Sequence, residues 1–122
     1  MFEVKNNIFE MEIMMSVRII IDSASDLTKE QADKLGLDFL PLKTIFGTEE
    51  YLDGITLNHQ QFYEKLIESD CMPTTSQIPP HDFEQLYADV KEKKDTAVVI
   101  TLSSRLSGTF QSANIALDGY ED

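Results

Sequence analysis

Two short runs of β-branched residues, Val17–Ile21 and Thr96–Leu102, constrain the fold of this chain more than any other feature. Both are predominantly apolar, with Arg18 as the single charged residue, which is the pattern of a buried strand in a parallel sheet. Four segments with helix signals lie between or after these runs: 28–36, 58–70, 80–94 and 110–117. Strands that alternate with helices predict an α/β fold, a mainly parallel sheet flanked by helices.

Local signals define several element boundaries. Thr28 and Asn58 each precede a glutamine by three residues, the spacing of a capping box that starts a helix. The segment 37–46 is rich in strand formers and predicts one strand, with its proline at a sheet edge or a bulge. A turn at 47–50 predicts a short hairpin. The proline-bounded segment 73–80 is expected to be a polar loop.

Composition limits the classes of function. The chain has 122 residues, 42% of them hydrophobic and 26% charged, as expected for one compact globular unit. A formal charge of -12, from 10 Lys and Arg against 22 Asp and Glu, argues against nucleic-acid binding, which needs clustered cations. No apolar run is long enough to span a membrane. Cys71 is the single cysteine, and no Cys/His set has metal-binding spacing, so we expect a cytoplasmic protein without metal or cofactor.

The first residues, 1–16, precede the clear strand pattern. They lack the basic start and long apolar middle of a signal peptide. We therefore expect an N-terminal extension over 1–16, forming an irregular segment or a loose strand, and one α/β domain over 17–122.

The loop 103–109 leads from the second strand run into a helix, and it carries several hydroxyl groups. The first N–H groups of a helix attract negative charge. Ser107 and Thr109 can donate hydrogen bonds there, and Gly108 would let a ligand approach the backbone closely. Because no lysine accompanies them, a carboxylate suits this loop better than a nucleotide triphosphate. The alternative is that Ser107 merely caps the helix.

A second hydroxyl cluster, Thr74, Thr75 and Ser76, lies between prolines that restrict its conformation. Taken alone, such a segment is usually a helix-entry turn. In open α/β sheets, however, ligands bind beyond the carboxyl ends of the strands. The two clusters together therefore predict a binding site.

The loop after the first strand run suggests a different chemistry. Asp22 could hold magnesium or act as the nucleophile of a phosphotransferase. The paired-acid pattern of such enzymes is not met, since Ala24 takes the second place. A hydrolase with Ser104 or Ser107 as its nucleophile lacks the GxSxG elbow, and no triad can be assembled by spacing. We therefore expect no enzyme, and a turn role for this loop is the simpler interpretation.

Three segments stand out when they are read together: Ile21-Asp22-Ser23 with Asp26-Leu27, then Pro73-Thr74-Thr75-Ser76-Gln77, then Leu102-Ser103-Ser104-Arg105-Leu106-Ser107-Gly108-Thr109-Phe110-Gln111-Ser112-Ala113. In this order, and separated by helices, they resemble the DegV family of bacterial lipid-binding proteins. The match covers about Val17 to Leu117.

The resemblance implies a carrier of a long-chain fatty acid. The acid's carboxylate would contact Thr75 and Ser107, with Ser76, Gly108 and Thr109 as candidate supporting residues. A partner fatty acid kinase would phosphorylate the bound acid to an acyl phosphate.

Two departures from the family pattern are visible. Where the family often has proline and then serine after Thr-Ser-Gln, this chain has Ile78 and Pro79. Family members also run more than twice as far, so we expect an incomplete N-terminal domain without the C-terminal lid domain. Such a chain would self-associate through its uncovered sheet edge, or serve as a fragment with only an interaction role.

Overall fold

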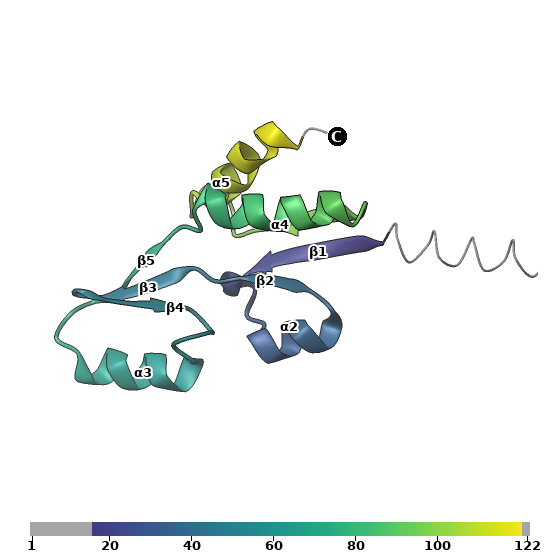
Figure 1. Cartoon of the computed structure of the whole chain (residues 1–122). Coiled ribbons are helices and arrows are strands. Elements are labelled where there is room, and N and C mark those ends of the chain that lie inside the picture. Colours follow the sequence, from purple (N-terminus) through teal and green to yellow (C-terminus); the bar gives the residue numbers. More distant parts are fainter. Residues whose placement is uncertain (1–15, 121–122) are drawn as a thin grey trace, which may run out of the picture.

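The computed structural model describes residues 16–120, which form two small sheets with helices packed against them (Figure 1). The expected N-terminal extension lies, apart from residue 16, outside the described residues. The first sheet is parallel, with the strand order β2-β1-β6: β1 is Val17–Asp22, β2 is Asp38–Leu40 and β6 is Thr96–Ile100. The helices α4 (Pro80–Glu92) and α5 (Thr109–Ala116) lie on one side of this sheet, and α2 (Lys29–Leu35) lies on the other (Figure 1). The predicted α/β fold is confirmed.

The second sheet is antiparallel, with the order β4-β3-β5. Its strands are β3 (Lys43–Phe46), β4 (Glu49–Leu52) and β5 (Thr74–Ser76). The predicted hairpin is β3–β4, and its turn contains Gly47 at a φ of 63°, a conformation that glycine adopts without strain. The helix α3 (His59–Glu68) packs on this sheet, where Phe62 meets Phe46 with ring centroids 5.8 Å apart.

The prediction of one strand over 37–46 was wrong, because the chain passes from one sheet to the other at Pro41. Proline has no N–H for a sheet ladder, so the ladder of β2 ends before it. The next residue, Leu42, is buried and donates its N–H to the Ser23 hydroxyl at 2.9 Å. This anchor turns the chain away from β2 and starts β3.

The prediction that 73–80 is a loop throughout was also wrong, because 74–76 form the strand β5. Thr75 pairs with Thr44 at the free edge of β3. An edge strand tolerates neighbouring prolines, since one of its sides needs no hydrogen-bond partner. The prolines therefore exclude a helix here without excluding a strand.

Both capping boxes are confirmed. The Thr28 hydroxyl accepts a hydrogen bond from the backbone N–H of Gln31 at 3.1 Å. The side-chain oxygen of Gln31 accepts one from the backbone N–H of Thr28 at 2.9 Å. Asn58 and Gln61 make the same reciprocal pair at the start of α3. Two helices thus begin where the sequence predicts.

The main core lies between the parallel sheet and the pair α4–α5. Its buried residues come from β1, the link between the two sheets, the segment before α4, and the helices α4 and α5: Ile20, Leu42, Ile78, Phe83, Tyr87, Ala113 and Ala116. The Tyr87 hydroxyl donates to the Ala113 carbonyl at 3.1 Å, and burial raises the pKa of this tyrosine. No helix among residues 16–120 is long and apolar enough to cross a membrane.

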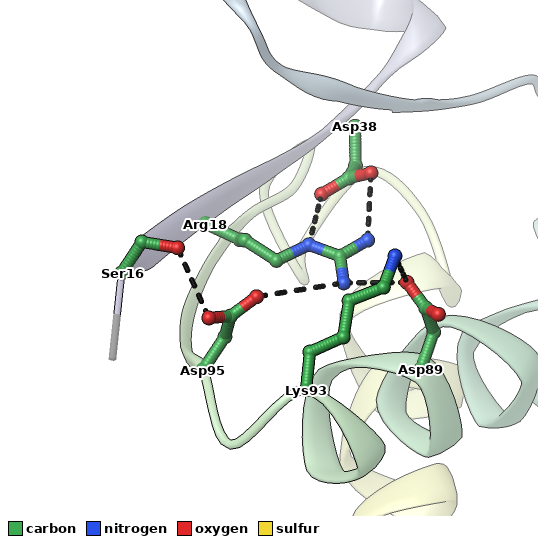
Figure 2. A network of polar contacts seen from close by, with 6 residues as sticks. All are labelled: Ser16, Arg18, Asp38, Asp89, Lys93 and Asp95. Carbon is green, nitrogen blue, oxygen red and sulfur yellow. Dashed lines mark hydrogen bonds and ion pairs between the residues drawn. The ribbon is translucent and has the colours of Figure 1, made fainter. Parts of the chain in front are cut away.

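An ion-pair network joins the amino-terminal ends of the parallel strands to α4 (Figure 2). Arg18 of β1 binds both carboxylate oxygens of Asp38 in β2, each at 3.0 Å. Its Nη1 donates to Asp89 of α4 at 2.6 Å and lies 4.0 Å from Asp95, just before β6. One guanidinium therefore connects two strands and a helix, and these acidic partners hold the Arg18 pKa above its ordinary value.

Candidate functional site

Gln77 and Ile78, which directly follow the hydroxyl cluster 74–76, lie against the first turns of α5. The segment that links β5 to α4 passes beside this helix, where the Ile78 N–H donates to the Thr109 hydroxyl at 3.3 Å. A proline at position 78 could not make this bond. The Gln77 side chain donates to the Ser112 hydroxyl, also at 3.3 Å. Thr109 and Ser112 are buried, at 0% and 1% exposed. Gln77 and Ile78 are therefore bound to side chains inside the first turns of α5.

Ser107 is half-buried and bound to the first turn of α5. Its hydroxyl accepts from the Thr109 N–H at 3.2 Å and lies 3.0 Å from the Thr109 hydroxyl. The residue between them, Gly108, occupies the N-cap position and has no side chain with which to cap the helix. Ser107 therefore caps the first turn of α5 in part, which is the alternative role that its position in the sequence suggested. Its exposed part still faces solvent beside the helix N-terminus.

Thr75 lies in β5, and its side chain is exposed. It shares a face of the antiparallel sheet with Thr44, its partner in the register, whereas the half-buried Ser76 points to the opposite face. Within residues 16–120, the Thr75 hydroxyl makes no hydrogen bond. Its donor capacity is available to a ligand.

The space beside Gly108 is filled by the side chain of Gln77. A Cβ atom at this position would lie 2.7 Å from Cδ of Gln77, closer than real Cβ atoms come. The Gln77 carboxamide thus occupies the space that the absent side chain leaves. Sequence reasoning missed Gln77 as a site residue, although it is the last residue of the Thr-Ser-Gln motif.

Asp22 is a structural clamp in this fold. Its side chain is buried, one carboxylate oxygen accepts from the Ala24 N–H at 2.9 Å, and the other accepts from the Leu102 N–H at 2.6 Å. These bonds tie the end of β1 to the loop that follows β6. Asp26 closes the turn with a φ of 65°. Among the described residues, no three His, Cys, Asp or Glu side chains cluster in a way that could hold a metal ion.

Replacing Asp22 by asparagine is expected to lower the free energy of unfolding by about 2 kcal/mol, because one charge-assisted bond to a backbone N–H is lost. The measurement is urea unfolding, with and without magnesium chloride. Magnesium should leave both stabilities unchanged. If magnesium stabilises the wild type and not the variant, Asp22 is a metal ligand, and this result would support the phosphotransferase hypothesis.

Comparison with known proteins places this geometry in context. A sequence profile described as an uncharacterised protein of the DegV family matches residues 16–122. A DegV domain-containing protein of Clostridium perfringens is 39% identical over 103 residues, which are 84% of this chain and 37% of that protein.

Two solved structures share the fold at similar coverage. DegV of Bacillus subtilis, a fatty acid binding protein, matches with a TM-score of 0.77 and 34% identity over 84% of this chain and 36% of its own. A DegV family protein of Thermus thermophilus, described by its fatty acid binding, matches with a TM-score of 0.76 and 32% identity over 87% and 38%. The chain thus spans little more than a third of the length of the proteins that it matches.

Proposed function

Because the chain belongs to the DegV family, we propose that it binds a long-chain fatty acid and holds the carboxylate between Thr75 and Ser107. The observation that carries the proposal is that Gln77 and Ile78, which directly follow the hydroxyl cluster 74–76, are hydrogen-bonded to the first turns of α5, the helix that Ser107 precedes. Fatty acid binding by the solved relatives from Bacillus subtilis and Thermus thermophilus supports the choice of ligand.

The hydrogen-bond pattern around Thr109 suits a carboxylate. The Thr109 hydroxyl accepts from the Ile78 N–H, and its own proton can go to the Ser107 oxygen, which also accepts from the Thr109 N–H. When Thr109 is the donor, both acceptor positions of the Ser107 oxygen are used, and the Ser107 proton is free to be donated to a ligand. Neutral donors beside a helix N-terminus can hold a single negative charge without a full counter-charge.

The remaining parts of the proposal concern partners. A fatty acid kinase would receive the bound acid and phosphorylate its carboxylate, so that this chain acts as a carrier without catalysing a reaction. The free thiol of Cys71 supports a reducing, cytoplasmic setting. Among the described residues β6 is an edge strand of the parallel sheet, and its unpaired side supports self-association at that edge.

Lipid extraction tests the proposed ligand. The protein is purified at its natural length, and bound lipid is released with solvent and identified by mass spectrometry. We expect close to one long-chain fatty acid per molecule, and native mass spectrometry should show the matching mass increase. A protein that carries no fatty acid, and takes none up from solution, does not have the proposed function.

A further inference from the structure

Gln77 connects the two halves of the candidate site, and we propose that it is the positioning residue that sets the placement of the Thr75 hydroxyl relative to the Ser107 hydroxyl. The inference rests on the proposed function, since it concerns the same carboxylate. Gln77 follows Thr75 by two residues in the chain. Its side chain ends beside Gly108, the residue after Ser107. It therefore reaches from one hydroxyl segment to the other.

Gln77 is exposed overall, but its carboxamide makes two contacts with α5 and the residue before it. Its Nε2 donates to the hydroxyl of Ser112, a residue that is 1% exposed and held inside α5. Its Cδ lies where a side chain at position 108 would begin, 2.7 Å from an ideal Cβ. Any residue other than glycine at 108 displaces the carboxamide, so the glycine and the glutamine act as a matched pair.

Such a connection matters because the two hydroxyls stand on separate parts of the fold. Thr75 belongs to the antiparallel sheet, whereas Ser107 precedes a helix that packs on the parallel sheet. A carboxylate bound by both needs each donor within about 3 Å at the same time. A shift of one segment by about 1 Å is enough to lose the joint geometry. Binding of the apolar tail has no such requirement, so Gln77 should affect head-group recognition alone.

The test compares the affinity for a fatty acid with the affinity for the fatty alcohol of the same chain length, using protein at its natural length. Gln77→Ala should lower the affinity for the acid about tenfold and change that for the alcohol less than about twofold. Gly108→Ala should have the same effect, because its methyl group displaces the flexible end of Gln77 and leaves the fold intact. Gln111→Ala removes an exposed glutamine of α5 and is the matched control.

The double variant Gln77→Ala/Gly108→Ala tests whether Gly108 acts through Gln77 or independently of it. If Gly108 acts only through Gln77, the double variant binds the acid no more weakly than either single variant. Additive losses, or equal losses for acid and alcohol, overturn the positioning role. In that case the proposed function still stands if Thr75→Ala and Ser107→Ala weaken acid binding. A wild-type protein without affinity for fatty acid overturns both.

Discussion

The double variant Thr75→Ala/Ser107→Ala is expected to bind a long-chain fatty acid about 100-fold more weakly than the wild type. Each hydroxyl is proposed to donate one bond to a carboxylate, and a bond to a charged group contributes about 1.5 kcal/mol, so that two give about 3 kcal/mol. Each single variant should lose about tenfold. Isothermal titration with one saturated acid measures the three affinities, and circular dichroism confirms that the variants remain folded.

The chain offers closely matched controls for this experiment. Thr74 neighbours Thr75 in β5, and Ser104 lies in the same loop as Ser107; both are exposed. The variant Thr74→Ala/Ser104→Ala removes the same atoms from the same two segments and should bind as the wild type does. Equal losses in both double variants would show that the segments matter and that the two named hydroxyls do not.

Replacing Arg18 by methionine is expected to lower the free energy of unfolding by about 3 kcal/mol. The Arg18 side chain is 17% exposed, and its loss leaves the half-buried Asp38 carboxylate without a cation and Asp89 with Lys93 alone. Methionine retains the apolar volume of the arginine stem, so the effect reports mainly the charge and its hydrogen bonds. Urea unfolding at neutral pH measures it. Lys34→Met removes an exposed ion pair with Glu30 and should cost less than about 0.5 kcal/mol.

The same unfolding measurement at acidic pH tests the charge contribution of Asp89. Arg18, and then Lys93, hold the pKa of Asp89 below its ordinary value by donating hydrogen bonds to its carboxylate. A carboxylate whose pKa is lowered in the folded state stabilises the protein above its ordinary pKa. That contribution is lost as the pH falls through the lowered value. The difference between wild type and Arg18→Met should therefore shrink below about pH 4. A difference that stays constant down to pH 2 contradicts this assignment.

Sequence predicted the individual helices and strands around the candidate site better than their arrangement in space. The helix that starts beside Ser107, the two capping boxes and both long strand runs were readable, because each depends on residues within a few positions of one another. The strand β5 was missed, since its formation depends on the open edge of β3, about thirty residues earlier. Gln77 was missed for a related reason: its partners, Gly108 and Ser112, are distant in the chain.

What the sequence determined by itself was the alternation of strands and helices and the presence of hydroxyl groups at strand and helix ends, because hydrophobic period, capping and turn chemistry act locally. Tertiary structure alone decided that Pro41 divides one apparent strand between two sheets. It also decided that both carboxylate oxygens of Asp22 accept hydrogen bonds from backbone N–H groups. Finally, it decided that Gln77 fills the space beside Gly108. These outcomes depend on which distant segments come to share a surface, and local preferences carry no information about that.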